Sequence, residues 1–388
     1  MKLESRPDFI EQELKTLKDE HLYRKLRNVQ NKGSSAIIDG RKVLNLNSND
    51  YLGLSRHHSV ISETTRAMEE ISPCSSRLVA GNNSQLLDLE SQLAIHRRTE
   101  SSLVFTSGYT AVIGALSTLA NKETVIFSDE LNHASIVDAC RLSGAKICVF
   151  RHNDPDHLLD LIQKQAKRRI VVTEGIFSIG GEMSNLKDIC KLAKEFDALT
   201  VVDDAHGDFI YGPGGAGVPS YFKVNGLIDL HVSSLSKALG CFGGYVATSE
   251  DIREYLINKS RQFIFTSALP AHLCVAANTA LGIARKGHLQ EILFRNVNLF
   301  TRTLKKYGFN IGNSRSQIIP LFIGPENIAV RFAEMSLKNG IFVHPMRFPV
   351  VKKGSSVIRV SLTASHTKME LITALRVIEE IGEELLAV

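Results

Sequence analysis

Tryptophan is absent from this 388-residue chain, and aromatic residues as a whole make up only 7% of it. The six cysteines are scattered, without a CxxC pair or a spacing typical of zinc ligands. They are therefore expected to be reduced thiols in a cytoplasmic protein, and no metal site is predicted. No stretch is long and apolar enough to span a bilayer, and the first residues carry no apolar signal region. A membrane partner is not expected.

Charge of one sign is not concentrated either. The formal net charge is +5, and the basic residues do not form a stripe, so the sequence predicts no nucleic-acid partner. This mild positive charge favours anionic substrates such as coenzyme A. Hydrophobic residues make up 44% of the chain and charged residues 22%, which is ordinary for a globular protein.

Alternating strand and helix patterns predict an α/β protein with a mainly parallel central sheet. Before them, an amphipathic helix is expected over Phe9 to Val29, and a turn at Asp39-Gly40 separates two short extended runs. The predicted strands of the sheet are residues 102–105, 124–127, 146–150, 170–173, 200–203 and 228–233.

The pattern changes beyond residue 281, where a long helix is expected up to about Tyr307. Shorter strands follow at 318–323, 341–344 and 356–362, which is typical of a small α+β domain. We therefore expect an N-terminal helix and arm over residues 1–46, a large α/β domain over 47–281 and a small domain over 282–388.

Lys237 lies just after the apolar run that ends at Val232, among small residues and glycines. A surface lysine in a turn would be the better interpretation of this residue alone. Burial next to a strand end, however, favours a neutral amine that can attack a carbonyl group.

A second segment strengthens the covalent interpretation. Asp203 stands where a strand buried on both faces ends, and open α/β sheets bind their ligands at that edge. His206 follows three residues later and can face the same cavity. A helix N-cap aspartate with a structural histidine is about as good an interpretation of this segment alone. A third segment, Phe105 to Ala111, follows a strand and opens a helix, whose free amides form an anion site.

These motifs resemble the α-oxoamine synthases, which are fold-type I pyridoxal-phosphate (PLP) enzymes with an α/β fold. The resemblance rests on DDAHG at Asp203–Gly207, SLSKALG at Ser234–Gly240 and GGYVA at Gly243–Ala247. It runs over nearly the whole chain, from NSNDYLGL at Asn47–Leu54 to LTASHT at Leu362–Thr367.

The resemblance implies roles for individual residues around the cofactor. Lys237 would carry PLP covalently and act as the catalytic base, Asp203 would pair with the ring nitrogen, and His206 would bond the phenolic oxygen. His133 would stack on the ring, and Ser178 would lie near it. The phosphate would be bound by Gly108, Tyr109 and Ser234, and by Thr266 and Ser267 reaching over from the other subunit of a homodimer.

Substrate contacts are implied as well. Arg359, alone in an apolar strand, would grip the amino-acid carboxylate, with Asn49 in support; an exposed edge arginine is the other interpretation. Arg24 lies three residues before Arg27, on one face of the expected helix, and would reach an acyl carboxylate unless this is a solvated basic face.

Three functions compete. The branch of the family that the chain resembles most joins L-alanine to a pimeloyl thioester, carried by coenzyme A or a carrier protein, in biotin synthesis. Sister enzymes use glycine with acetyl-CoA, or serine with a palmitoyl thioester. A catalytically silent scaffold subunit is the third, although it should have lost Lys237 or Asp203. Two departures, at Leu86 and at Pro349–Lys352, fall on the substrate side.

Overall fold

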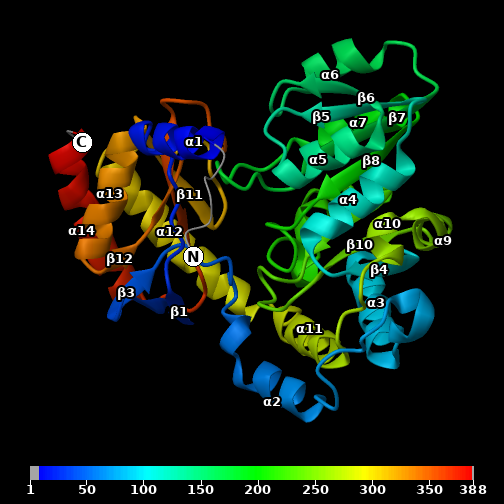
Figure 1. Ribbon diagram of the computed structural model, residues 1–388, viewed down its shortest axis with the longest axis horizontal. Helices are drawn as coiled ribbons and strands as arrows, with labels where there is room; N and C mark the ends of the chain where they lie inside the picture. Colours follow the sequence, from blue (N-terminus) through cyan, green and yellow to red (C-terminus); the bar gives the residue numbers. More distant parts are fainter. Residues whose placement is uncertain (1–7, 387–388) are drawn as a thin grey trace. The chain divides into compact units, whose positions relative to one another are not determined.

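The computed structural model describes residues 8–386, which form two compact units (Figure 1). The larger unit contains residues 49–178 and 182–293, and the smaller contains the segment up to residue 48, residues 179–181 and residues from 294 onward. The sequence-based boundaries at residues 46 and 281 stay a prediction. Within the described residues, no helix has both the length and the hydropathy needed to cross a membrane.

A seven-stranded sheet forms the centre of the larger unit, in the order β4-β10-β9-β8-β7-β5-β6. β5 to β9 pair in parallel, whereas β10 runs antiparallel to both β4 and β9. The predicted mainly parallel sheet is thus confirmed, but β10 was not recognised as a strand. The strands are β4 (Ser101–Phe105), β5 (Thr124–Asp129), β6 (Lys146–Phe150), β7 (Arg168–Glu174), β8 (Ala198–Asp203), β9 (Leu230–Ser234) and β10 (Gly244–Thr248).

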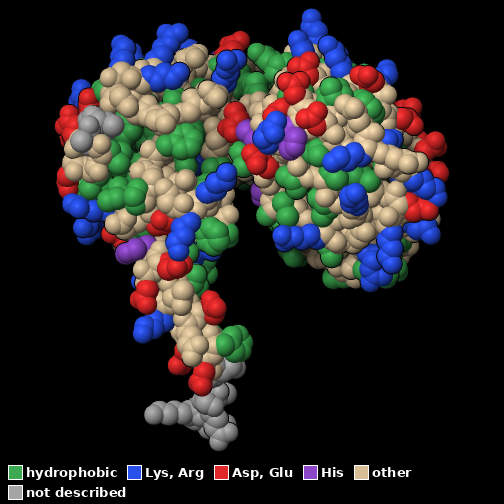
Figure 2. All heavy atoms as spheres, turned by 90° about the horizontal axis from the view of Figure 1, so that it is seen from above, with side chains coloured by type: hydrophobic (Ala, Val, Ile, Leu, Met, Phe, Trp, Pro, Cys, Tyr) green, Lys and Arg blue, Asp and Glu red, His purple; other side chains and the backbone are tan. Residues whose placement is uncertain are grey.

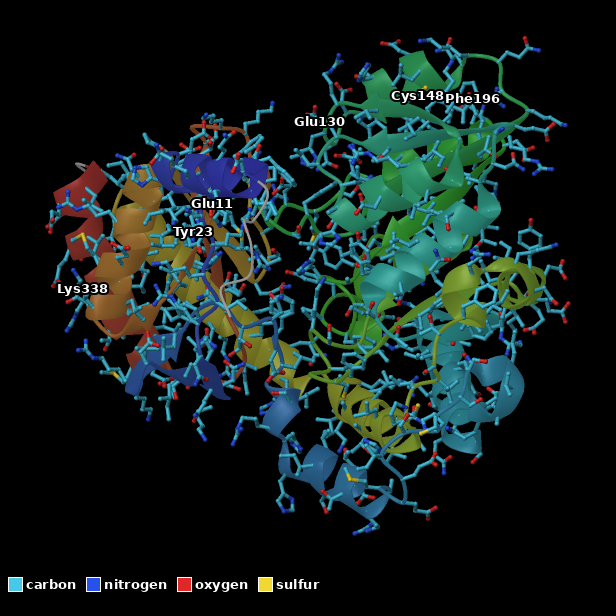
Figure 3. The ribbon with its side chains drawn as sticks, in the orientation of Figure 1. Glu11, Tyr23, Glu130, Cys148, Phe196 and Lys338 are labelled. Carbon is cyan, nitrogen blue, oxygen red and sulfur yellow. The ribbon has the colours of Figure 1, made fainter. Side chains whose placement is uncertain are left out.

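Helices cover both faces of this sheet. Successive strand residues alternate between two apolar clusters, so Ile126 and Ile170 belong to one, and Phe127 and Val171 to the other. Helices α4 (Gly108–Leu119), α5 (Ala134–Ser143) and α9 (Glu250–Lys259) contribute to the first cluster. Helices α6 (Pro155–Ile162) and α7 (Leu186–Glu195) contribute to the second, against which the labelled Cys148 and Phe196 also pack (Figure 3).

Nine further helices are described in the larger unit. They are η1 (Leu54–Arg56), α2 (His58–Arg66), the π-helix η2 (Arg77–Gly81), α3 (Ser84–Arg97), η3 (Pro213–Gly215), α8 (Gly217–Phe222), η4 (Asn225–Leu227), α10 (Arg261–Ile264) and α11 (Ala271–Ala284).

The smaller unit contains two small sheets, as its α+β pattern predicts. One has the order β1-β2-β3-β12 and the other β11-β14-β13. The strands are β1 (Val29–Lys32), β2 (Ser35–Ile38), β3 (Arg41–Asn45), β11 (Ile318–Gly324), β12 (Ile341–Phe342), β13 (His344–Met346) and β14 (Ser356–Ser361). The helices are α1 (Asp8–Asp19), α13 (Glu326–Lys338) and α14 (Lys368–Leu386), with α12 (His288–Lys306) beginning in the larger unit.

The N-terminal helix is shorter than expected. α1 ends at Asp19 rather than Val29, because His21 adopts a left-handed backbone with φ of 57° and closes the helix. The amides of Leu22 and Tyr23 both donate to the carbonyl of Leu17, at 2.8 Å. The predicted helix face of Arg24 and Arg27 is therefore wrong.

The helix expected up to Tyr307 is interrupted between α11 and α12, where Gly287 has φ of 79°.

On the face shown in Figure 2, basic and acidic side chains are interspersed.

Candidate active site

Polar groups collect where the central parallel strands end. β7 ends at Glu174, β8 at Asp203 and β9 at Ser234. Glu174 and Asp203 are direct partners in the ladder between β7 and β8. The carboxyl edge of the sheet thus carries Asp203 and Ser234, which the motifs had indicated, together with an acid, Glu174, which no motif had indicated.

A chain of side-chain contacts runs from Lys237 across His206. Lys237 Nζ lies 2.9 Å from His206 Nε2, and His206 Nδ1 lies 2.7 Å from the hydroxyl of Tyr51. That hydroxyl in turn donates to Asn49 Oδ1 at 3.1 Å. His206 is buried and Lys237 is half-buried. The structure therefore brings together three residues that were singled out and adds Tyr51, which was not.

The direction of these hydrogen bonds follows from counting protons. The Tyr51 hydroxyl donates its proton to Asn49, which favours the His206 tautomer that carries its proton on Nδ1. A neutral His206 then has an unprotonated Nε2, which accepts from the amino group of Lys237. Tyr51 and Asn49 thereby set the tautomer of the histidine that contacts the lysine.

His133 is held through its backbone. It caps the start of α5, with Nδ1 2.8 Å from the Ser135 hydroxyl, and its own amide donates to Glu174 at 2.6 Å. Burial lowers the pKa of His133; the charge of Asp203 opposes this shift and that of Lys237 adds to it. These influences place His133 beside both groups, as a neutral ring near neutral pH.

Glu174 is fully buried beneath this group of residues. Burial raises its pKa well above the usual value, as does the neighbouring Asp203, although Lys237 and the amide of His133 act in the opposite direction. Burial and the adjacent Asp203 therefore both disfavour the ionised form of Glu174.

The start of α4 forms a tight cradle beside Ser234. Ser107 and Thr110 make a reciprocal capping box, which leaves the first amides of the helix pointing outward. A Cβ atom at Gly108 would lie 3.0 Å from Ser234 Cβ, and one at Gly244 would lie 2.3 Å from the amide nitrogen of Gly108. Only glycine therefore fits at position 244, and a Cβ at position 108 would be tightly packed. Tyr109 is exposed, and its hydroxyl donates to Asp138.

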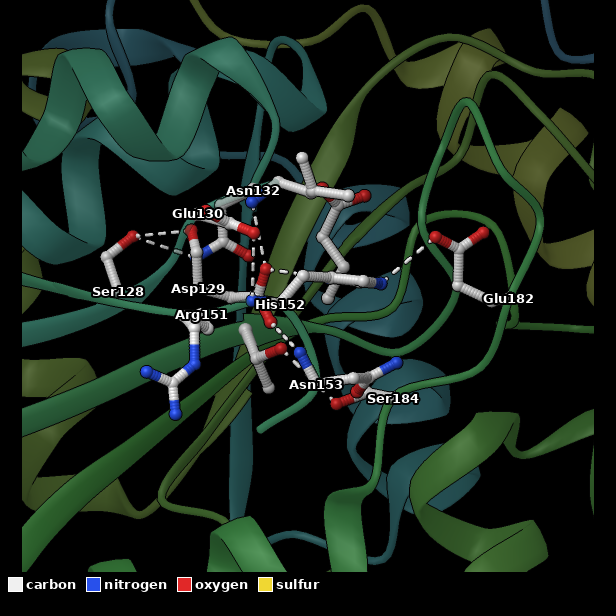
Figure 4. A network of polar contacts seen from close by, with 12 residues as sticks. Ser128, Asp129, Glu130, Asn132, Arg151, His152, Asn153, Glu182 and Ser184 are labelled. Atoms are coloured by element: carbon white, nitrogen blue, oxygen red, sulfur yellow. Dashed lines mark hydrogen bonds and ion pairs between the residues drawn. The ribbon is translucent and has the colours of Figure 1, made fainter. Parts of the chain in front are cut away.

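A partly buried polar network joins the loops before His133 and after Ser178 (Figure 4). His152 Nδ1 lies 2.9 Å from Asp129 and its Nε2 lies 3.0 Å from Glu182. The Asp129 carboxylate also accepts the amide of Leu131 at 2.9 Å, two residues before His133. His152 therefore ties the loop after β5 to the loop around residue 182. No sequence motif indicated this role.

The other singled-out residues lie elsewhere. Thr266 and Ser267 line a small cavity together with Thr106 and Leu86, the position at which the sequence departs from the family motif. Ser267 also forms an isolated β-bridge with Ser76. Arg359 is 7% exposed in β14, the central strand of its sheet, opposite His344 on β13. An exposed edge arginine is therefore excluded as its interpretation.

Arg24 and Arg359 both belong to the smaller unit, whereas Asn49 and Lys237 belong to the larger one. Arg24 lies in the segment after α1, where its guanidinium donates to the carbonyl of Phe348 at 3.5 Å. The roles implied for these residues stay predictions.

Comparisons with known proteins agree with the motifs. The family model of aminotransferase class I and II matches residues 41–378. An 8-amino-7-oxononanoate synthase from Thermoanaerobacter pseudethanolicus is 37% identical over 97% of this chain and 98% of that protein. Another, from Citrifermentans bemidjiense, is 40% identical over 96% and 98%. The solved serine palmitoyltransferase from S. paucimobilis with bound PLP and myriocin has a TM-score of 0.93 at 28% identity over 98% of each chain, which confirms the predicted fold.

Proposed function

We propose that this protein makes 8-amino-7-oxononanoate for biotin synthesis. The chain belongs to the class I and II aminotransferase family, and within it to the α-oxoamine synthases. The reaction joins L-alanine to a pimeloyl thioester, with release of carbon dioxide and the thiol. Within the structure, the observation that carries the proposal is the 2.9 Å contact between Lys237 Nζ and His206 Nε2 at the carboxyl edge of the sheet.

PLP is the cofactor of this family, and the residues present fit it. The start of α4 packs closely against Ser234 and Gly244. Its first amides and the hydroxyl of Ser234 suit a phosphate group. Asp203 would pair with the ring nitrogen, His133 would lie against the ring, and Lys237 would carry it. Gly108 and Tyr109 would supply phosphate-binding amides, and Ser178 would lie near the ring.

Bound PLP supplies an electron-withdrawing ring that stabilises negative charge on the α-carbon of the amino acid. Asp203 would pair with the ring nitrogen and keep it protonated, which would strengthen that effect. Lys237 would remove the α-proton and later return a proton to the same carbon. His206, which contacts Tyr51, would hold the phenolic oxygen of the ring. Arg359 would bind the substrate carboxylate with support from Asn49, and Arg24 would meet the far carboxylate of the acyl chain.

Thiol release by the PLP-loaded protein tests the assignment across L-alanine, glycine and L-serine, each with pimeloyl, acetyl and palmitoyl thioesters on coenzyme A or a carrier protein. We expect release with L-alanine and a pimeloyl thioester. The Lys237→Ala variant should release no thiol while keeping its fold, whereas Lys167→Ala, at the opposite edge of the sheet, should behave as wild type. Substantial release by Lys237→Ala would contradict the catalytic role of the lysine.

A second activity is favoured by one observation, the TM-score of 0.93 with a serine palmitoyltransferase. Release only with serine and a palmitoyl thioester would move the protein to that activity. Release with glycine and acetyl-CoA would assign the other sister reaction. If no pair released thiol although Lys237 bound PLP, the scaffold interpretation would replace the enzymatic one.

The active unit is proposed to be a homodimer. Thr266 and Ser267 are next to Phe265, which is 71% exposed, and Ser267 bridges to Ser76 in the segment that leads to the exposed Val79. These exposed apolar side chains suit a second copy of the chain. Each copy would then present Thr266 and Ser267 to the phosphate of its partner.

Mixed dimers separate this arrangement from a site built by one chain. A Lys237→Ala chain and a chain carrying Thr266→Ala with Ser267→Ala would each be inactive or strongly impaired alone. Mixing after partial unfolding should restore about a quarter of the wild-type activity, because one site of each mixed dimer is then intact. Activity that stays at the level of the parents would show that the residues act within one chain.

A further inference from the structure

A fully buried arginine lies behind the segment that carries Asp203 and His206. Arg97, the last residue of α3, donates from Nε to the hydroxyl of Tyr245 at 2.9 Å and from NH1 to Asp204 at 2.8 Å. Its NH2 lies 3.0 Å from Asp208. None of the three charged side chains is exposed to solvent. The guanidinium thus holds two carboxylates that stand immediately beside the cofactor residues in sequence.

Asp204 is held through its amide, its carbonyl and the carboxylate oxygen Oδ2. Its amide donates to Val232 on β9 at 2.8 Å, and its carbonyl accepts the amides of Gly207 and Asp208, at 2.9 and 2.8 Å. Its side chain accepts from Arg97 and, at 3.0 Å, from the amide of Val218. Asp203 precedes this residue directly and His206 follows two residues later, so both lie in the turn that Asp204 holds.

Three glycines from separate segments pack against the Asp204 carboxylate. A Cβ atom at Gly175 or at Gly207 would lie 2.3 Å from Asp204 Oδ1, and one at Gly217 would lie 2.0 Å from Oδ2. Gly217 also has φ of 89°, a left-handed conformation that favours glycine. Glycine at these three positions leaves room for the Asp204 carboxylate. A larger residue at any of them would displace that carboxylate.

We propose that Arg97 is a positioning residue for the cofactor, acting through Asp204 and Asp208 to fix the turn that presents Asp203 and His206. The proposal concerns cofactor binding rather than substrate choice, so its test does not depend on which acyl thioester the enzyme uses.

The electrostatics around the pair support this role. Burial raises the pKa of Asp204, which Arg97 opposes; at Asp208 burial also acts to raise the pKa, but Arg97, His96 and Tyr245 together outweigh it and lower the pKa. The other titratable groups facing the pair are His96, His231 and Tyr245; burial lowers the pKa of both histidines and raises that of the tyrosine. Those three are therefore neutral near neutral pH, which leaves Arg97 as the cation that balances the two acids.

The test compares Arg97→Met, Asp204→Asn and the double variant by titration of the protein with PLP, without substrates. Each single change should raise the dissociation constant of PLP about tenfold or more, because small displacements of positioned groups are costly. The dissociation constant of PLP for the double variant should be no higher than the higher of the two single-variant values, since both changes break the same contact between Arg97 and Asp204. The visible circular dichroism per bound PLP, which reports the orientation of the ring, should change in all three.

A matched control is Arg169→Met. Arg169 is half-buried at the start of β7, where it donates to the carbonyls of Ile162 and Lys164, away from the turn. It should bind PLP as the wild type does. Folded Arg97→Met with wild-type affinity and dichroism, or single effects that simply multiply in the double variant, would overturn the proposal.

If Arg97→Met alone does not fold, Asp204→Asn carries the same test. It keeps Arg97 paired with Asp208 and removes the charge at Asp204, so no buried charge is left unpaired and the fold is expected to survive. Wild-type PLP affinity in that variant would overturn the proposal equally.

Discussion

The two edges of the seven-stranded sheet differ in how they hold charge. At the carboxyl edge, Glu174, Arg97, Asp204 and Asp208 are buried. Arg97 forms ion pairs with both aspartates. At the amino edge, the charged side chains are exposed to solvent. Lys167 pairs with Glu123 at 2.6 Å, and the two side chains are 67% and 49% exposed. Arg168, the first residue of β7, is exposed as well.

This contrast shows that buried charged and polar groups are found at the carboxyl edge of the sheet and exposed ones at the amino edge. A buried ion or acid is expensive unless its partners are in place, so such groups cannot be removed one at a time. An exposed pair adds little to stability and can be removed freely. The carboxyl edge is therefore where single substitutions should have large effects, and the amino edge is where they should not.

The largest effect is expected at Asp203. Replacing Asp203 with asparagine should slow the exchange of the α-proton of L-alanine with D2O about 100-fold or more, because the ring nitrogen loses its ionised partner. Exchange is followed by NMR and needs no acyl thioester. Asp229→Asn, the same change just before the amino end of β9, is the matched control and should leave the rate unaltered. Equal losses in both variants would remove the distinction between the edges.

A smaller effect is expected at Tyr51. Tyr51→Phe removes the hydroxyl 2.7 Å from His206 Nδ1, so His206 loses the partner that sets its tautomer. We expect kcat to fall about tenfold, with little change in the KM for L-alanine. Steady-state kinetics measures both constants, with Tyr255→Phe on α9 as an exposed control. An unchanged kcat would show that His206 is held adequately without Tyr51.

The next effect concerns stability and its dependence on pH. At His152, burial alone would lower the pKa, but the Asp129 and Glu182 carboxylates outweigh it and raise the pKa to about 9. A group whose pKa is higher in the folded state stabilises that state fully below its unfolded pKa of about 6.5. This stabilisation is lost as the pH rises through 9.

Urea unfolding at several pH values measures this contribution, which should be on the order of 2 kcal/mol. His152→Asn should remove that part of the pH dependence, whereas His288→Asn, at an exposed histidine, should keep it. A variant with the wild-type pH profile would show that His152 does not hold the two loops through its charge.

Much of this edge could be predicted from the sequence, because its signals are local. A buried β-branched run followed by an acid places Asp203 at a strand end, and Ser107-Gly108 after a strand predicts the start of α4. The family motifs then identified Lys237 and His206 as neighbours, and the structure places them 2.9 Å apart.

The groups that support these residues could not be predicted in the same way. Tyr51 meets His206 across 155 positions of sequence, and Arg97 meets Asp204 across 107. Such pairs depend on tertiary packing, which no local pattern encodes. The overlong N-terminal helix failed for the opposite reason: amphipathic periodicity continued past His21, whose left-handed backbone ends α1.

The smallest effect is expected at the amino edge, and it completes the contrast. Lys167→Ala removes the exposed partner of Glu123, which is free to interact with water and ions instead. The midpoint of thermal unfolding and the PLP affinity should both equal those of the wild type, and neither should respond to salt differently. A clear loss of stability in Lys167→Ala would mean that charge at the amino edge is as interdependent as charge at the carboxyl edge, and burial would then not explain the difference between them.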